Sequence, residues 1–342
     1  MEIVRNGIQK KTYHAVHADL GSGSREPMPA RRMTFNNDGI IIVDKPENMS
    51  SARVVARIKA ALGAKKVGHT GTLDPFATGL LVCCINRATR LARFFLEGDK
   101  TYEAMLHLGI ETDTQDATGA VTSENRVADI EEERLVEVLQ GFQGWINQVP
   151  PAYSALKHKG VPLYKLARKG TPVSKPARKV HISSLRILEI ETPFIRFEVR
   201  CSAGTYVRTL SADIGNALGC GGHLKHLKRT RSSGFNLEDA LLLSEIEQLA
   251  AHGGLAPHMV AMADALKGMP TKVADDALAA KVAHGIPLTD GDMDPGKMGR
   301  HESHTKIVSR RHGLLAVVQQ KKGSKKYDYC CVFQTEHAKV TV

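Results

Sequence analysis

The chain has 342 residues, of which 42% are hydrophobic, and this favours one large domain with a sizeable core plus a second, smaller domain. Lys and Arg number 47 against 36 Asp and Glu, so the formal net charge of +11 favours an anionic partner. No apolar run approaches the roughly 18 residues of a membrane span, and the N-terminus lacks a signal-peptide core, so we expect a soluble, cytoplasmic protein.

The positive charge is concentrated in two stretches. Residues 138–188 contain no Asp or Glu, and residues 221–237 carry only cations among their charged side chains. Clustered charge of this kind suits the phosphate backbone of a nucleic acid, although a generic basic surface would have the same composition.

The cysteines and histidines give no pattern of a disulfide framework or a metal site. The six cysteines are Cys83, Cys84, Cys201, Cys220, Cys330 and Cys331. Adjacent cysteines rarely bridge to each other and no Cys-x-x-Cys spacing occurs, so we expect reduced, mostly buried thiols. His14 and His17 have a spacing that suits a metal, but without other ligands we expect them to be solvated.

The chain begins with a stretch that has no sustained hydrophobic periodicity, and residues 1–35 are predicted to form a flexible basic leader. Residues 40–43 form a short apolar strand that ends at Asp44-Lys45-Pro46. Ser50 or Ser51 offers an N-cap for the next helix, which Gly63 should end.

Residues 68–81, GHTGTLDPFATGLL, surround a single carboxylate, that of Asp74. Pro75 pushes Asp74 toward extended dihedral angles, so we expect Asp74 at a chain reversal. Three glycines allow positive φ or the close approach of another chain, as a loop that contacts a ligand requires. Asp-Pro alone also fits an aspartate that merely caps a helix.

Two strands are predicted next, at residues 80–85 and from Lys100 to about Leu108. Short polar side chains at residues 112–116 suit self-bonded turns, and their two aspartates are weak evidence for a cation site. Asp129 then begins a capping-box pattern for a helix that ends at Gly141.

The acid-free stretch contains a basic protrusion with a small apolar face at about residues 150–179. Apolar and charged residues alternate at 195–201, as in a half-buried strand, and a helix follows to Gly219. Tyr206 and Arg208 lie two apart, so in an extended segment they would share a face. From about residue 271 onward we expect a small β-rich domain, supported by the alternation at Gly313 to Val318 and the strand-like run from Tyr327 to Phe333.

Five blocks of the chain resemble, in order, the TruB family of pseudouridine synthases, the tRNA pseudouridine-55 synthases. The blocks are Gly39 to Ser51, Gly68 to Leu81, Asp99 to Gly119, Val149 to Gly170 and Cys201 to Gly234. Asn48 departs from the usual glycine of the family, but asparagine tolerates the left-handed conformation, so we expect the turn to survive. Gly222 stands where the family more often has alanine.

The resemblance implies an α/β (mixed α+β) pseudouridine synthase fold, with helices flanking a central mixed or antiparallel sheet. It implies a catalytic domain over residues 36–270, with an RNA-binding thumb-like insertion at about residues 150–179. A small C-terminal PUA-like RNA-binding β domain would cover residues 271–342.

The reaction implied by the resemblance converts the T-loop uridine of tRNA, position 55, into pseudouridine. The N1 glycosidic bond breaks, the flipped-out uracil turns, and its C5 bonds to the sugar C1′. Asp74 matches the catalytic aspartate of the family and Arg208 the arginine that pairs with it. Tyr102 matches a tyrosine that stacks on the uracil and is placed to assist loss of the C5 proton. Whether Asp74 attacks C1′ or first removes a sugar proton stays open.

Four further positions match substrate-binding residues of the family. Tyr206 matches a second tyrosine that contacts the base, and Leu227 matches a pocket wall beside the uracil. His69 matches the histidine that fills the space left in the RNA fold. Lys45 is expected to make a phosphate or a loop contact.

The resemblance implies no cofactor and no metal, with the T-arm stem-loop of tRNA as partner and neither a membrane nor a protein partner, so a monomer is expected. One alternative is a guide-RNA-dependent synthase of the dyskerin type. The basic insertion and the lack of a long Lys-rich tail favour the stand-alone enzyme. Another alternative is a tRNA-binding or tRNA-folding protein with secondary catalysis, against which the intact Asp74 and Arg208 argue.

Overall fold

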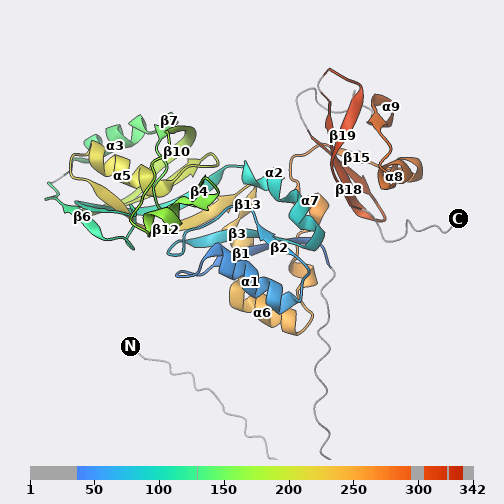
Figure 1. The fold of residues 1–342 in the computed structure, drawn as a ribbon, viewed down its shortest axis with the longest axis horizontal. Coiled ribbons are helices and arrows are strands. Elements are labelled where there is room, and N and C mark those ends of the chain that lie inside the picture. Colours follow the sequence, from blue (N-terminus) through green and yellow to red (C-terminus); the bar gives the residue numbers. More distant parts are fainter. Residues whose placement is uncertain (1–36, 129, 294–303, 322, 334–342) are drawn as a thin grey trace, which may run out of the picture. The chain divides into compact units, whose positions relative to one another are not determined.

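A computed structural model describes residues 37–128, 130–293, 304–321 and 323–333 (Figure 1). The predicted leader with His14 and His17, and Asp129 of the predicted capping box, lie outside the described residues. Within the described residues, no helix combines the length and the apolar character that a membrane span requires.

A ten-stranded mixed sheet forms the centre of the larger part of the chain, as expected. Its order is β14-β1-β3-β12-β4-β11-β10-β7, with β2 paired to β3 and β13 to β12. The pairs β1/β14 and β3/β12 are parallel and the others are antiparallel. The strands are β1 (Gly39–Lys45), β2 (Val67–His69), β3 (Thr78–Ile85), β4 (Lys100–Leu108), β7 (Gly144–Gln148), β10 (Arg178–Glu191), β11 (Phe194–Cys201), β12 (Gly222–Ser232), β13 (Phe235–Asn236) and β14 (Leu241–Leu242).

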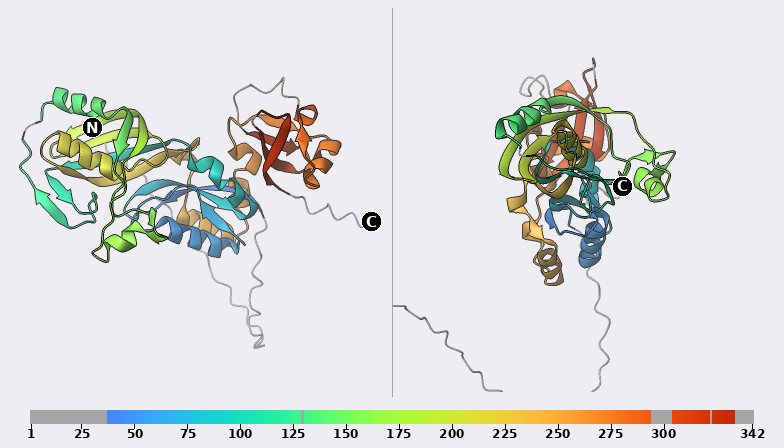
Figure 2. Two further views of the ribbon diagram at one scale, coloured as in Figure 1. Left: turned by 45° about the horizontal axis from the view of Figure 1, so that its top comes forward. Right: turned by 90° about the vertical axis from the view of Figure 1, so that its left-hand side faces the viewer.

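Helices α1 (Ser51–Leu62) and α6 (Leu243–Ala251) cover one part of this sheet and lie side by side, blue and orange in Figures 1 and 2. Their apolar residues pack on β1 and β3 in one core cluster. The Ser50 hydroxyl caps α1 by accepting from the backbone N–H of Arg53, and Gly63 ends the helix at φ 59°. The predicted start and end of this helix are therefore confirmed, with Ser50 as the cap.

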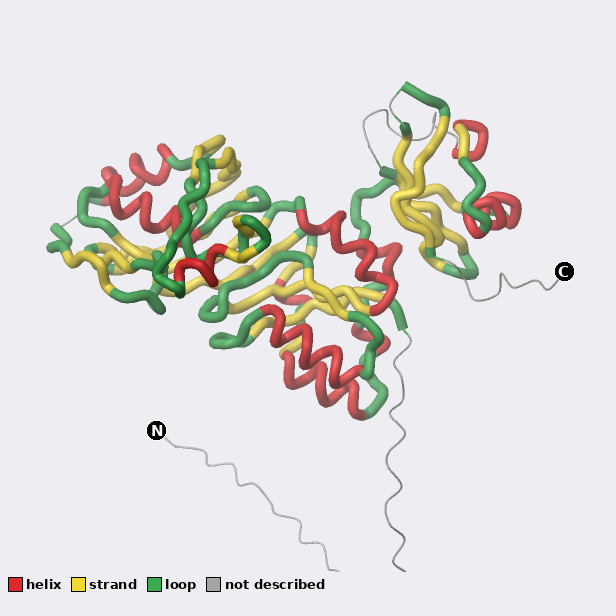
Figure 3. Tube along the Cα trace, viewed as in Figure 1, coloured by secondary structure: helices red, strands yellow, loops and turns green. Residues whose placement is uncertain are grey.

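Helices α3 (Glu132–Gly141) and α5 (Val207–Ala217) cover the other part, over β4, β10, β11 and β12 (Figure 3). The N-cap of α3 is Glu131, which makes no capping side-chain bond, so the helix start expected from Asp129 is wrong. The helix still buries the expected Leu135, Val138 and Leu139.

Shorter elements connect these layers. They are α2 (Ala92–Leu96), the hairpin of β5 (Ile110–Thr112) and β6 (Val121–Glu124), the hairpin of β8 (Lys157–His158) and β9 (Val161–Pro162), α4 (Leu163–Ala167), and three 3-10 turns, η1 (Asn86–Leu91), η2 (Leu237–Asp239) and η3 (Ala256–His258). Asn48 adopts φ 58°, so the turn survives the replacement of glycine as expected.

The C-terminal region contains a separate five-stranded sheet of order β15-β17-β18-β19-β16. Its elements are α7 (Met262–Ala265), β15 (Thr271–Val273), α8 (Asp276–Ala283), β16 (Leu288–Thr289), α9 (Asp290–Met293), β17 (Thr305–Ser309), β18 (Gly313–Gln320) and β19 (Lys326–Val332). The alternation expected in β18 is wrong, because residues 314–318 are all buried. Leu315 and Val318 pack with α8, while Leu314 and Val317 belong to a second apolar cluster that includes Ala265.

Gly79 permits the close contact between β3 and β12 next to the predicted site. It adopts φ +95°, and a Cβ there would lie 2.4 Å from the carbonyl oxygen of Arg229. We expect Gly79→Ala to lower the free energy of unfolding by about 2–5 kcal/mol, since backbone strain and overpacking add. Gly253 also has positive φ, at +72°, but no atom lies within 4 Å of its Cβ position. Urea denaturation should therefore give Gly253→Ala a much smaller loss, and equal losses would contradict the role of the contact.

Candidate active site

Asp74 lies in the loop between β2 and β3, at a tight reversal of the chain. The Ala77 backbone N–H donates to the Asp74 carbonyl at 3.2 Å, and β3 begins at Thr78. No helix follows Asp74 among the described residues 75–85. The reading of Asp74 as a helix cap is therefore wrong, and its carboxylate is free to serve the adjoining pocket.

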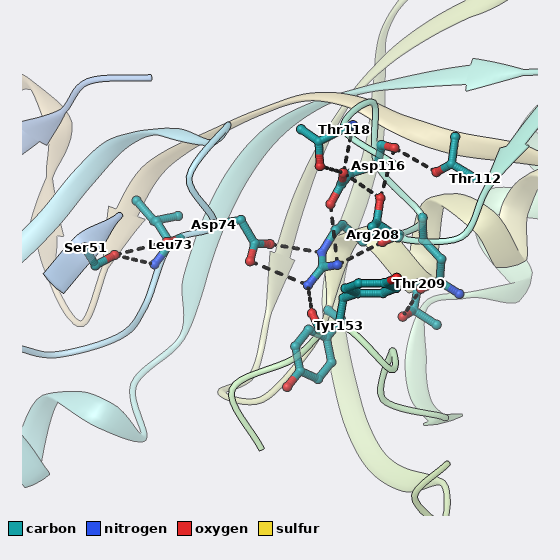
Figure 4. Close-up of polar contacts among 12 residues, drawn as sticks. Ser51, Leu73, Asp74, Thr112, Asp116, Thr118, Tyr153, Arg208 and Thr209 are labelled. Atoms are coloured by element: carbon teal, nitrogen blue, oxygen red, sulfur yellow. Dashed lines mark hydrogen bonds and ion pairs between the residues drawn. The ribbon is translucent and has the colours of Figure 1, made fainter. Parts of the chain in front are cut away.

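Two buried side chains from the preceding elements hold this loop. The Ser51 hydroxyl accepts from the Leu73 backbone N–H at 2.9 Å and donates to the Leu73 carbonyl at 3.1 Å (Figure 4). Lys45 Nζ donates to the carbonyls of Met49 and Pro75, at 2.7 and 3.1 Å. It also donates to the carbonyl next to it in sequence. The loop is thus fixed on both sides of Asp74.

Lys45 makes the expected loop contact. Its side chain is fully buried, and burial lowers its pKa to about 8. Of the two contacts expected for Lys45, the structure therefore contains the loop contact, through which Lys45 positions the catalytic loop. Its assignment to the substrate-binding residues stays a prediction.

We expect Ser51→Ala to loosen the catalytic loop, because it leaves the buried N–H and C=O of Leu73 without partners. The cost should be about 1–3 kcal/mol of unfolding free energy. Ser50→Ala is the matched control: it removes a hydroxyl one residue away that only caps the exposed helix end. The catalytic rate is measured at a temperature where both variants are folded. If Ser51→Ala loses no more rate than Ser50→Ala, the loop does not depend on Ser51.

Arg208 faces Asp74 from the first turn of α5 (Figure 4). Its Nε lies 3.0 Å from Asp74 Oδ2 without hydrogen-bond alignment, and its Nη2 donates to Oδ1 at 3.5 Å. The same guanidinium donates to the carbonyls of Thr114 and Tyr153, both at 2.8 Å, and lies 3.4 Å from Asp116 Oδ2. Arg208 is 4% exposed. Its planar fork is therefore held on several sides, which a lysine could not reproduce.

The second carboxylate near Arg208 belongs to a self-bonded turn. Asp116 accepts from the Thr114 hydroxyl at 2.8 Å and from the Thr118 backbone and hydroxyl at 2.9 and 2.5 Å. The self-bonded turns expected at residues 112–116 are therefore present. The weak cation-site hypothesis is wrong for Asp116, whose carboxylate pairs with Arg208. Among the described residues, no group of three or more potential metal-ligating side chains occurs.

The surroundings of Asp74 oppose its ionisation. Its side chain is 35% exposed, and burial raises the pKa of its carboxyl above the ordinary value. The Arg208 cation lowers that pKa and the Asp116 anion raises it. Arg208 is therefore the neighbour that most favours the ionised carboxylate, which is the form suited to stabilising positive charge that develops in a substrate.

A pocket of about 450 Å³ opens beside Asp74, within the size range of small-molecule and nucleotide sites. Its described lining includes Tyr102, Tyr206 and Leu227 together with Arg208. Tyr102 comes from β4 and is 9% exposed, and burial raises the pKa of its hydroxyl. The structure therefore brings four of the residues singled out from the sequence to one pocket around Asp74.

Tyr206 is the N-cap of α5, and Arg208 lies in its first turn. The expectation that they share a face of an extended segment is wrong, although both line the pocket. Gln148, which is fully buried, fixes the backbone of Tyr206. Its Oε1 accepts from the Tyr206 N–H at 2.7 Å, and its Nε2 donates to the Tyr206 carbonyl at 3.0 Å. The guanidinium of Arg178 lies over the Tyr206 ring, 4.7 Å from its centroid.

His69, at the end of β2, is not among the residues that line this pocket. Its ring is half-buried, and burial together with Arg229 lowers its pKa, which favours the neutral imidazole. The role of His69 toward RNA stays a prediction.

Arg229 also lines the pocket, but the sequence analysis did not single it out from the other cations of residues 221–237. It is 1% exposed, donating from Nε to the Leu80 carbonyl at 2.7 Å and from Nη2 to the Gly71 carbonyl at 3.1 Å. Both partners belong to the segment that carries Asp74. The signal was its spacing of two from Leu227, which places both on one face of β12.

Family models and individual relatives point to the same protein family. The model of the TruB family pseudouridylate synthase N-terminal domain matches residues 59–207, and that of the tRNA pseudouridylate synthase B C-terminal domain matches residues 208–267. The tRNA pseudouridine synthase B of Geobacter sulfurreducens is 41% identical over 281 residues, covering 82% of this chain and 92% of that protein. The enzyme of the same name from Desulfotalea psychrophila is 50% identical over 218 residues, 62% of this chain and 88% of that protein.

Solved structures agree at the level of the fold. A chain of a Cbf5-Nop10-Gar1 complex superposes with a TM-score of 0.65 at 28% identity, covering 86% of this chain and 85% of that chain. A chain of an H/ACA RNP bound to a substrate RNA containing 2′-deoxyuridine superposes with a TM-score of 0.67 at 26% identity, covering 87% and 86%. The resemblance drawn from the five sequence blocks is confirmed, and the chain belongs to the TruB family of pseudouridylate synthases.

Proposed function

We propose that this protein converts the T-loop uridine of tRNA, position 55, into pseudouridine, with Asp74 as its catalytic carboxylate. The observation that carries the proposal is the Asp74 carboxylate, held by Arg208 in a pocket that Tyr102 and Tyr206 also line. The names of the curated relatives support tRNA as the substrate.

The pocket chemistry matches the needs of this isomerisation. When the N1–C1′ bond breaks, its electron pair leaves with the uracil and positive charge develops at C1′. An ionised Asp74 next to C1′ stabilises that charge, whether it bonds to C1′ or removes a sugar proton. The uracil then turns and its C5 bonds to C1′. The proton on C5 is lost and N1, which no longer bonds to the sugar, takes up a proton, so the product is an isomer of the substrate.

The two tyrosines favour a uridine that has left the RNA stack. Extrusion of a nucleotide costs a few kcal/mol, and stacking on an aromatic ring returns about 1–3 kcal/mol per base. Tyr102 is buried beside Asp74 and serves as the stacking ring in this proposal, with Leu227 forming the wall next to the base.

We also propose the domain organisation that the resemblance implies. The ten-stranded and five-stranded sheets support a catalytic domain over residues 36–270 and a PUA-like domain over residues 271–342. The small β8/β9 hairpin and α4 support an RNA-binding thumb at about residues 150–179, whose charged residues are all cations. The protein acts as a monomer in this proposal.

The test is pseudouridine formation on an unmodified T-arm stem-loop, without guide RNA and without added metal. Product is expected, and the same RNA with cytidine at the target position should give none. The likeness to the Cbf5-Nop10-Gar1 structure favours a guide-dependent synthase as the second candidate. Product that forms only when a guide RNA is added would establish that candidate, and RNA binding without product under either condition would indicate a binding protein.

A further inference from the structure

Trp145 is the only tryptophan of the chain, and its side chain is 64% exposed. It lies on β7, which ends the order of the ten-stranded sheet. In the register with β10, Trp145 is directly opposite His181, and their ring centroids are 4.9 Å apart. Lys179 Nζ lies 5.2 Å from the centroid of the Trp145 ring. We call these three residues the Trp145 platform.

The platform lies on the same two strands as residues that serve the candidate active site, but on the other face of the sheet. Strand alternation places Trp145 and Lys179 on the face opposite to their neighbours Gln148 and Arg178, which serve the pocket. Gln148 is three residues from Trp145, a distance of about 10 Å along a strand. The His181 backbone N–H donates to the Ser202 hydroxyl at 2.9 Å, and the Ser202 backbone N–H donates to the His181 carbonyl at 2.8 Å. Ser202 lines the pocket.

The chemistry of the platform suits a nucleotide. A large exposed ring gives the π-face on which any base can stack, and a neighbouring ammonium group attracts the phosphate. Residues 138–188 contain no acid, so β7 and the first half of β10 contribute no carboxylate to repel an RNA backbone. This charge favours RNA over a protein partner, and the pocket served by the same strands already has the features of a nucleotide site.

We propose that the Trp145 platform binds an unpaired nucleotide of the RNA substrate outside the catalytic pocket, with its base stacked on the indole and its phosphate beside Lys179. The assignment of RNA as the ligand rests on the proposed function. The platform thereby contacts a nucleotide other than the uridine in the pocket. It contributes to RNA affinity and not to bond breaking.

The fluorescence of the sole tryptophan reports directly on this site. Titration with unmodified full-length tRNA should quench the Trp145 emission, with the same midpoint as the anisotropy change of the labelled RNA. A blunt RNA duplex with every base paired should give little quenching at equal bound fraction. Emission that stays unchanged while the tRNA saturates the protein would overturn the proposal. Emission that changes with protein concentration in the absence of RNA would also overturn it, because a second copy would then cover the ring.

Substitution separates the ring from the charge. Trp145→Ala should weaken tRNA binding and raise KM by about tenfold while kcat is kept, because loss of one stacked base is of this order. Trp145→Phe should restore most of the affinity, and Lys179→Ala should reduce the dependence of affinity on salt. Val121→Ala, at another exposed apolar position (54%), is the matched control and should leave binding unchanged.

The result also distinguishes failure of the platform from failure of the proposed function. If the wild type forms pseudouridine but Trp145→Ala leaves both Kd and KM unchanged, the platform is wrong and the proposed function stands. If the wild type forms no pseudouridine on any tRNA yet binds it with quenched emission, the platform stands as an RNA site and the proposed function fails. An unchanged melting temperature of Trp145→Ala is expected, since the ring is mostly exposed.

Discussion

Asp74→Asn should abolish pseudouridine formation, lowering kcat by on the order of 10³-fold or more, because the amide carries no negative charge to stabilise C1′. The substitution keeps the size of the side chain and leaves the reversal between β2 and β3 intact. RNA binding should therefore persist within a few-fold, since the pocket walls and the basic surface are unchanged.

The stability of this variant provides the control. Burial raises the pKa of Asp74, so in the folded protein ionisation of this carboxyl is unfavourable relative to the unfolded chain, and at neutral pH it costs stability. We expect the melting temperature of Asp74→Asn to be equal to that of the wild type or higher. Rate and affinity are measured on the same T-arm stem-loop. Retained isomerisation, or loss of RNA binding in step with loss of product, would remove Asp74 from the centre of the chemistry.

The local features of the site were open to prediction because each depends on a few neighbouring residues. The Asp-Pro reversal, the strand before Lys45 and the cap of α1 follow from short-range sterics and hydrogen bonding, and the structure contains all three. The motif around Asp74 also identified the family, and with it the pocket partners Tyr102 and Arg208 from distant parts of the chain.

The supports of the site were missed because they depend on tertiary contacts. Arg229 is indistinguishable in composition from the exposed cations beside it, and only the pairing of β12 with β3 makes it a buried donor to the loop. Gln148 is likewise an ordinary polar residue until α5 brings the backbone of Tyr206 against it. The burial of Lys45 has the same cause, since a lysine in a sequence predicts an exposed side chain and not three carbonyl partners.

The errors in secondary structure have the same origin. An extended segment at Tyr206 and Arg208 was plausible from their spacing, but α5 begins between them, because its packing on β4 and β12 outweighs local preference. In β18 the alternation was overridden by burial on both faces. Strand patterns report how many faces a strand buries, and that number is set by elements far away in the sequence.

Arg208→Gln should lower kcat/KM by at least about 100-fold and move the acidic limb of its pH profile to higher pH. Activity requires ionised Asp74, so it rises with pH through the pKa of this carboxyl. Burial raises that pKa and Arg208 opposes the rise, so removal of the cation raises the pKa further. Arg208→Lys keeps the charge but loses the fork, and it should show a smaller shift of the limb with a similar loss of rate.

Loss of stability must be separated from loss of chemistry in this variant. Asp116, with a side chain 5% exposed, loses its cation in Arg208→Gln, and breaking a buried pair of this kind costs about 3 kcal/mol. Adding Asp116→Asn to Arg208→Gln removes the unpaired charge, so part of the unfolding free energy in urea should return. The rate should not return with it, because Asp74 still lacks its cation. Recovery of activity together with stability would mean that Arg208 acts only as a structural residue. If stability returns while the acidic limb stays displaced to higher pH, the guanidinium controls the ionisation of Asp74.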